Sequence, residues 1–217
     1  MKLFKYIGIV LLSLVIILYV LPAGLVRIPA VQKFLAEGTA EYFEKTLHTE
    51  IEIERIEYRL FNKLALKNVS MRDQSGNILF TASRIAAGID LIPLINRQFR
   101  INSVQLYTFD LKLRKNTKDS PLNIQYIIDA FASPKKEENP PVDLQIKNIR
   151  LYSGKVSLDI EDQPALKDRL DFNHLALENI IGRINLNSLK NNQLDGSIKR
   201  LSFTEKSGFS VKQLSLD

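Results

Sequence analysis

The chain has 217 residues, 25% of them charged and 45% apolar, which is an ordinary composition for a folded protein of one or two domains. It contains no cysteine, so disulfides, thiol chemistry and thiolate metal ligands are excluded. The formal charge of +6 comes from Lys and Arg spread along the chain, and this gives no support for a nucleic-acid surface.

An uncharged run extends from Tyr6 to Val26, preceded by two lysines and ended by Arg27. As a helix it would be roughly 30 Å long, which is the thickness of a bilayer core. The preceding lysines predict a cytoplasmic N-terminus and place the rest of the chain across the membrane. A cleaved signal peptide is the alternative, because residues 21–24 resemble a poor cleavage site, but the run is long for one. We predict a single-pass anchor over residues 1–27.

Residues 28–48 have the pattern of an amphipathic helix, and Pro29 suits its first turn. The opposite face is charged and net acidic, unlike the lysine-rich face of a helix that lies on a bilayer. We therefore expect the apolar face to pack against the following sheet. That predicted apolar stripe consists of Val31, Phe34, Leu35, Gly38 and Tyr42.

From Thr49 onward the apolar residues alternate at period two, which is typical of strands with one apolar face. The clearest stretch is Ile85–Leu113, where Pro93 separates two alternating strands. The sequence therefore predicts a mainly β fold built on a curved antiparallel sheet. Turns between strands are predicted at Ser75-Gly76-Asn77, Ser153-Gly154, Asp195-Gly196 and Ser207-Gly208.

A six-residue pattern recurs in these strands: apolar, two polar, apolar, polar, apolar. Two consecutive polar residues shift the alternation by one, so a bulge or bend there keeps the apolar side chains on one face. The pattern thus predicts a curved sheet. Strict copies begin at Ile53, Leu66, Ile101, Ile146, Ile198 and Val211, and a looser copy begins at Phe172.

Two interruptions divide the strand region. Ser120 and Pro121 are an N-cap and first-turn signal, and they predict a short helix near residues 121–131. A polar, proline-rich linker occupies residues 133–141.

The resulting organisation has a first β-groove segment at residues 49–132 and continuing β-groove repeats at residues 142–217. The last residue, Asp217, directly follows an alternating strand. Because an exposed final edge invites aggregation, we interpret the chain as truncated at its C-terminal end and as the beginning of a longer one.

The sequence shows no catalytic constellation. It has no Gly-rich phosphate loop, no Gly-x-Ser-x-Gly elbow and no His-Glu-x-x-His motif. His48 and His174 are isolated, and His174 occupies a polar position of the strand pattern, where a solvent-facing side chain is expected. We therefore expect no enzyme activity, no metal and no cofactor.

A persistently apolar sheet face is either the core of a compact sandwich or the lining of an open trough. Only two amphipathic helices are available as a second layer, so an open, taco-like trough that is apolar inside and polar outside also fits. Such a trough suits acyl chains. The lining predicted from alternation is Ile53, Val69, Met71, Ile89, Leu106, Leu111 and Leu151.

The order of several motifs resembles the N-terminal part of the AsmA superfamily, and its TamB-like members in particular, over most of residues 1–150. The motifs are Ile28-Pro-Ala-Val-Gln-Lys-Phe34, Leu66-Lys-Asn-Val-Ser-Met71, Asp73-Gln-Ser-Gly76, Leu91-Ile-Pro-Leu-Ile95, Ile101-Asn-Ser-Val-Gln-Leu106, Asp119-Ser-Pro-Leu-Asn-Ile124 and Ile128-Asp-Ala-Phe131. The resemblance implies an anchor in the inner membrane, a periplasmic bulk, and a β-groove related to chorein-type bridge-like lipid transfer proteins.

The resemblance also implies a non-enzymatic conduit for phospholipid between the inner and outer membranes. It further implies contact with an outer-membrane barrel protein through a C-terminal part. The alternative function is a scaffold for assembling outer-membrane proteins, in which open sheet edges pair with client strands. Copurified phospholipid would favour the conduit, whereas a stable complex with a barrel protein and no lipid would favour the scaffold.

Overall fold

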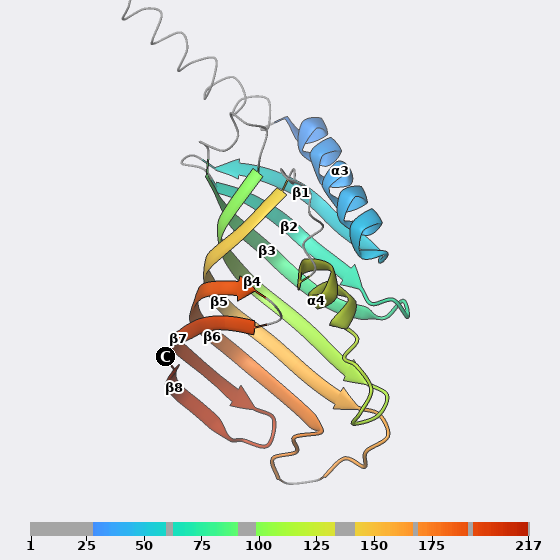
Figure 1. The fold of residues 1–217 in the computed structure, drawn as a ribbon, viewed down its shortest axis with the longest axis vertical. Coiled ribbons are helices and arrows are strands. Elements are labelled where there is room, and N and C mark those ends of the chain that lie inside the picture. The colour runs from blue at the N-terminus through green and yellow to red at the C-terminus, as the bar shows by residue number, and fades with distance from the viewer. Residues whose placement is uncertain are drawn as a thin grey trace, which may run out of the picture.

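The computed structural model describes residues 28–59, 63–90, 99–132, 142–166, 169–190 and 193–216. Within these ranges the fold is mainly β, as predicted, with eight strands in one sheet and two helices (Figure 1). The strands are β1 (Ile51–Arg59), β2 (Lys63–Arg72), β3 (Ile78–Asp90), β4 (Phe99–Lys115), β5 (Val142–Ile160), β6 (His174–Lys190), β7 (Gln193–Glu205) and β8 (Ser210–Leu216). The helices are α3 (Pro29–Leu47) and α4 (Gln125–Ala132).

The strands follow one another in space in the order β1 to β8, so β1 and β8 are the two ends of the sheet and the sheet is not closed. No helix in the described ranges is long and apolar enough to cross a membrane. The predicted anchor at residues 1–27, the turn at Pro93 and the linker at residues 133–141 lie outside the described residues.

The expected antiparallel arrangement is wrong at one junction. β4 and β5 pair in parallel, from Phe99 opposite Val142 to Lys115 opposite Ile160, whereas the other neighbouring strands are antiparallel. Parallel neighbours need a connection that returns the chain to its starting end, and the segment 116–141, which includes α4, provides it. Alternation has the same period in both arrangements, so it does not distinguish them.

A line of left-handed residues crosses the sheet, and at Asn68 it gives one of the predicted copies the expected bend. The four residues with this backbone are Asn68 (φ 46°), Thr108 (φ 46°), Ser153 (φ 54°) and Asn179 (φ 55°). Each is the second of two residues that separate apolar positions, and Asn68 belongs to the predicted copy that begins at Leu66. The strand register is also interrupted in the copies that begin at Ile101, Ile146, Ile198 and Val211.

Two of the predicted turns are confirmed, and they have the same construction. In the β2–β3 hairpin, the N–H of Asp73 donates to the carbonyl of Asn77 at 2.7 Å, and Gly76 has φ 81°. In the β7–β8 hairpin, the N–H of Glu205 donates to the carbonyl of Phe209 at 2.7 Å, and Gly208 has φ 96°. Glycine adopts this left-handed backbone without a steric penalty, which explains the Ser-Gly signal at both turns.

The other two predicted turns are wrong, because Ser153-Gly154 and Asp195-Gly196 lie inside β5 and β7. Both glycines allow a close approach instead of a chain reversal. A Cβ at Gly154 would lie 2.0 Å from the ring of Phe109, and one at Gly196 would lie 2.6 Å from the carbonyl oxygen of Asn185. A glycine inside a strand is expected at such a contact.

The helix α3 begins at Pro29, as predicted, but the face that it turns to the sheet is not the predicted one. Ala36, Ala40 and Leu47 are buried, whereas Phe34, from the predicted stripe, is 73% exposed. Small alanine side chains let the helix backbone lie close to β1, yet they contribute little to a hydrophobic pattern. The larger apolar residues on the other side of the helix, such as Phe34 and Tyr42, give the stronger hydrophobic pattern although they do not face the sheet.

The helix α4 begins four residues later than the N-cap signal predicted. The hydroxyl of Ser120 does not cap a helix; it accepts the N–H of Thr117 at 2.9 Å and donates to the Thr117 carbonyl at 2.8 Å. This local exchange holds the loop after β4. The following backbone bonds, such as Gln125 N–H to Leu122 O at 2.9 Å, then start the helical turns.

Two hydrophobic clusters hold the fold together. The helix-covered cluster lies where α3 and α4 pack over β1 and β2, and it consists of Ala40, Phe43, Leu47, Ile51, Ile53, Met71, Tyr126 and Ile127. The sheet cluster joins β3 to β7 and consists of Phe80, Ala82, Ile85, Leu106, Phe109, Leu151, Val156, Leu177, Ile180, Leu201 and Phe203.

We predict that Gly154→Ala lowers the free energy of unfolding by about 1–3 kcal/mol, because its Cβ would overlap the ring of Phe109. The measurement is chemical unfolding of the full-length chain in detergent. Combining it with Phe109→Leu should recover part of the loss, since the smaller side chain removes the overlap. Gly38→Ala is the matched control: no atom lies within 4 Å of its position in α3, and alanine should stabilise that helix. An unchanged stability in Gly154→Ala would contradict the packing described.

Candidate functional site

The apolar side chains of the sheet form rows that run from strand to strand on one face. Residues directly paired across neighbouring strands point to the same side of a sheet, so the register defines these rows. One row is Ile51, Met71, Phe80, Leu111, Val156 and Leu177. A second row is Ile56, Leu66, Ile85, Leu106 and Leu151, and it continues through Gly182 to Leu201 and Leu214.

Between these rows lies the densest part of the face. Ala82 pairs with Phe109, whose ring covers Gly154, and Gly154 pairs with Ile180. Phe109 and Ile180 are 5% and 4% exposed, whereas the residues of the flanking rows from β4 and β5 are half-buried. The face therefore combines a packed central line with accessible apolar side chains on either side of it.

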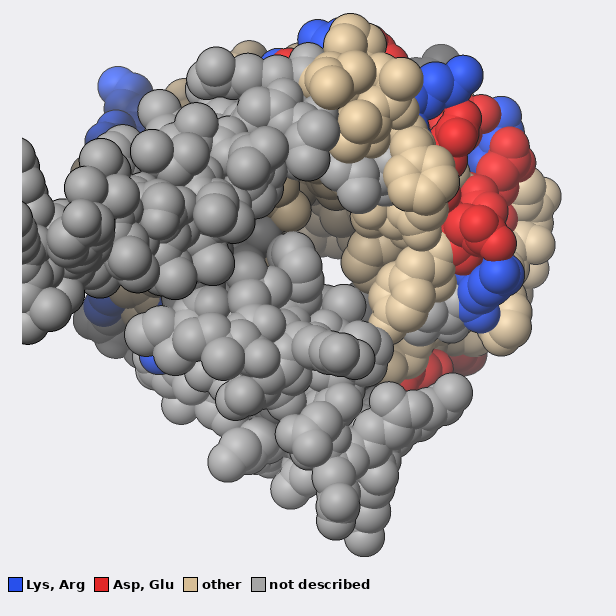
Figure 2. Space-filling view, turned by 90° about the horizontal axis from the view of Figure 1, so that it is seen from above, with Lys and Arg blue, Asp and Glu red and all other residues tan. Residues whose placement is uncertain are grey.

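The opposite face of the same strands is polar. The guanidinium carbon of Arg84 lies 3.6 Å from the ring centroid of Tyr107, and that ring stacks on Tyr152 with a centroid distance of 4.6 Å. Farther along, Lys155 pairs with Glu178 at 3.0 Å. Figure 2 shows Lys, Arg, Asp and Glu side chains on the outside of the curved wall and uncharged residues toward its hollow. The sheet is thus divided into a charged side and an apolar side.

The residues predicted to line a trough fall into two groups. Ile53 and Met71 belong to the helix-covered cluster, and Val69, which pairs with Ile53, is only 7% exposed. Ile53 and Met71 therefore lie beneath the helices, and Val69 is a buried core position. The others sit where no described helix covers the face.

Leu106 and Leu151 pair with each other in the sheet cluster, and Leu111 pairs with Phe80 one row away. All three leucines are half-buried. Ile89 is paired with Ile101 in the backbone, and its side chain lies outside the described residues. The candidate site is therefore the part of the apolar face that spans β3 to β7.

Alternation missed several members of this site. Phe80, Phe109, Ile180 and Val156 belong to the sheet cluster but were not predicted as lining. A usable signal was present: Leu106-Tyr-Thr-Phe109-Asp-Leu111 and Leu151-Tyr-Ser-Gly154-Lys-Val156 have the same spacing as the six-residue pattern. Tyrosine as a polar member and glycine as an apolar one kept these segments outside a strict match.

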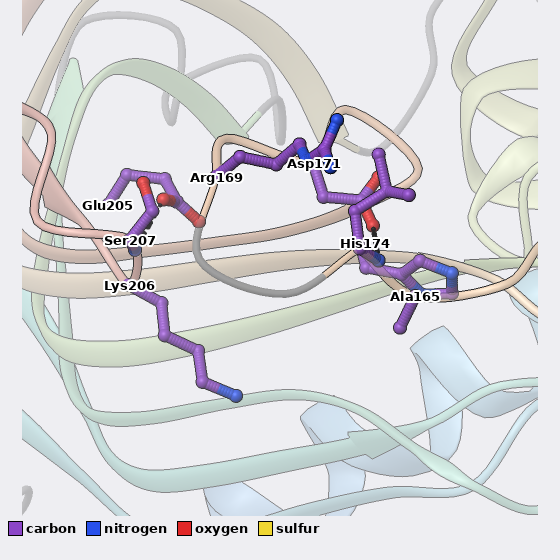
Figure 3. Close-up of a pocket in the computed structure, with 8 residues that line it drawn as sticks. Ala165, Arg169, Asp171, His174, Glu205, Lys206 and Ser207 are labelled. Carbon is purple, nitrogen blue, oxygen red and sulfur yellow. Dashed lines mark hydrogen bonds between the residues drawn. The ribbon is translucent and has the colours of Figure 1, made fainter.

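A cavity of about 460 Å³ lies away from the apolar face, between the loop after β5 and the β7–β8 turn (Figure 3). The two carboxylates that line it accept hydrogen bonds from backbone N–H groups. Asp171 accepts the N–H groups of Leu166 at 2.8 Å and Asn173 at 2.9 Å, and the Leu166 bond holds the pKa of this carboxyl below its usual value. Glu205 accepts the N–H of Ser207 at 2.6 Å. These groups brace turns, and we assign the cavity a structural role.

His174 also borders this cavity; it is partly exposed, but it is not isolated as the sequence suggested. Its side chain is 19% exposed, and the ring nitrogens contact the carboxylate of Asp159 and the carbonyl of Gln163, the latter at 3.0 Å. Both partners are acceptors, so this arrangement satisfies both ring nitrogens when the imidazole is protonated. The bond to Asp159, followed by that to Gln163, raises the pKa of His174 above its ordinary value.

The described part of the chain contains no group of three or more His, Cys, Asp or Glu side chains placed to hold a metal ion. Neither a family model nor a curated protein matches this chain. The most distinctive feature of the described sheet is its division into an apolar face and a charged face.

We predict that stability falls as the pH rises through the pKa of folded His174. Because the folded pKa is raised, the stabilisation is complete below the ordinary histidine pKa of about 6.5 and is lost as the pH rises from there through the folded pKa. The thermal midpoint of the full-length chain should decline over this range, and the decline should be shallower in His174→Gln. His48→Gln changes the only other histidine and should retain the slope. Identical slopes for all three proteins would exclude this role.

Proposed function

We propose that this chain is a non-enzymatic conduit for phospholipid, anchored in the inner membrane with its sheet in the periplasm. The curved sheet forms an open trough whose apolar face contacts acyl chains, while headgroups remain in water. The observation that carries the proposal is the pair of apolar rows on the described sheet. The first continues from Phe80 in β3 to Leu177 in β6, the second continues through Gly182 of β6 to Leu201 in β7, and the sheet cluster that includes them contains no helix residue.

The pattern of exposure supports a lining in preference to a closed core. Leu106, Leu111 and Leu151 are half-buried, which leaves apolar surface available to a ligand. In a compact sandwich a second layer would cover such residues. The described helices instead pack at β1 and β2, where the helix-covered cluster closes the face.

The chemistry of an acyl chain fits this surface. Burial of apolar area contributes about 25 cal/mol per Å², or about 0.8 kcal/mol per CH₂ group, without a directional contact. Apolar side chains on successive strands offer this stabilisation without a directional contact, so a lipid can move along them without meeting a specific binding site. The charged outer face keeps the opposite side of the wall in water.

The competing proposal is a scaffold for the assembly of outer-membrane proteins. Among the described strands β8 pairs only with β7, so it presents one edge with backbone groups available to another strand. A scaffold would bind its client at the edge of the sheet, whereas a conduit would bind lipid on the apolar face. The two proposals are therefore separable by experiment.

We predict that a photo-crosslinking residue at Leu111 traps phospholipid in living cells, whereas one at Lys112 does not. Successive strand residues point to opposite faces, and Lys112 lies 3.9 Å from Asp110 on the charged side. The probes are placed in the full-length protein, and trapped lipid is identified by mass spectrometry.

A second pair tests whether the row continues to the next strand. Val156 is the register partner of Leu111, and its neighbour Lys155 pairs with Glu178 on the charged face. Lipid at Leu111 and Val156 and at neither lysine supports a continuous lining. If positions 111, 112, 155 and 156 give protein adducts and no lipid, the conduit proposal is wrong and the scaffold proposal is favoured.

A further inference from the structure

The helix α3 carries two separate apolar faces. The inner face, with Ala36, Ala40 and Leu47, is buried against the sheet. The outer stripe consists of Ile28, Val31, Phe34 and Tyr42, of which Ile28 is 47%, Phe34 73% and Tyr42 44% exposed. A phenylalanine that is three-quarters exposed, next to other exposed apolar residues, indicates a surface that meets something apolar.

The position of the stripe in the chain limits what it meets. The uncharged run that we predict to span the membrane ends at Val26, and α3 begins at Pro29. Two connecting residues extend by at most about 7 Å, so the first turn of α3 lies at the bilayer surface when the anchor is inserted. From Ile28 to Tyr42 the stripe is about 21 Å long at 1.5 Å per residue.

The acidic side chains of this helix, which argued against membrane contact in the sequence, have partners within the protein. Glu41 pairs with Lys45 at 2.6 Å, and Glu37 pairs with Lys33 at 3.7 Å. Glu44 accepts the N–H of Ile51, the first residue of β1, at 3.0 Å. The three glutamates are thus each engaged by a donor within the protein.

We infer that the outer stripe of α3 lies in the interface of the membrane that holds the anchor, so that the helix is enclosed between the bilayer and β1. This rests on the anchor in the proposed function, but not on lipid transport along the sheet. An interfacial helix of this kind fixes the orientation of what is packed on it. Here it would hold β1, and with it the helix-covered start of the apolar face, against the bilayer.

The chain contains no tryptophan, so a single introduced indole reports its own surroundings. Phe34→Trp places the reporter in the stripe. Lys33→Trp is the matched control, because it is the adjacent residue, its side chain is 74% exposed, and its i,i+4 pair contributes little to stability. Val15→Trp, in the middle of the uncharged run, reports the anchor itself.

The full-length variants are reconstituted in phosphatidylethanolamine and phosphatidylglycerol vesicles that contain lipids brominated at shallow or deep acyl positions. At position 34 we expect a blue-shifted emission and its loss with shallow bromine, at position 33 neither change, and at position 15 loss with deep bromine. Quenching at position 15 but equal emission at positions 33 and 34 would overturn the interfacial helix while the anchor stands. No quenching at any of the three positions would overturn both.

Discussion

The fold depends on one constraint: a strand with two consecutive polar residues must bend if it is to keep its apolar side chains on one face. A residue in left-handed conformation absorbs this shift in four strands. Among residues with a side chain its cost is low for asparagine, which occupies two of the positions. Because the bends lie at matching levels, each strand remains paired with the next. The apolar rows, the charged outer face and the packing of Phe109 over Gly154 all follow from that alignment.

The two helices make the two ends of the apolar face different. At β1 and β2 they cover it with the helix-covered cluster, and Tyr126 donates from its hydroxyl to the carbonyl of Arg72 at 3.2 Å, which ties α4 to the end of β2. From β3 onward the sheet cluster has no described helix above it. The helices thus contribute to the cluster at β1 and β2, whereas the sheet cluster consists of strand residues alone, with a buried central line flanked by half-buried side chains.

Much of this architecture could be predicted from the sequence, because it is set by local patterns. Alternation gives the strands, Gly76 and Gly208 give two hairpins, and the doubled polar residues give the bulges. Features set by distant contacts could not be predicted in this way. The parallel pairing of β4 with β5 cannot be recognised from alternation. Ser153-Gly154 resembles a turn signal in the sequence, but in the structure Gly154 leaves space for the ring of Phe109. The candidate lining was predicted in part, since alternation identifies a face but not which section of it lies beneath α3.

Because every bend lies within a strand, the width of the sheet along its strands and its extent across them are determined separately. The width of the wall is set within a single strand, by the residues on either side of the bend, whereas its extent across the strands is set by their number. Each strand adds about 4.8 Å, so seven intervals between β1 and β8 extend about 34 Å. A sheet of this design extends when further strands that carry the same six-residue pattern are added at its edge. The width of the sheet and its extent across the strands can therefore vary independently of each other.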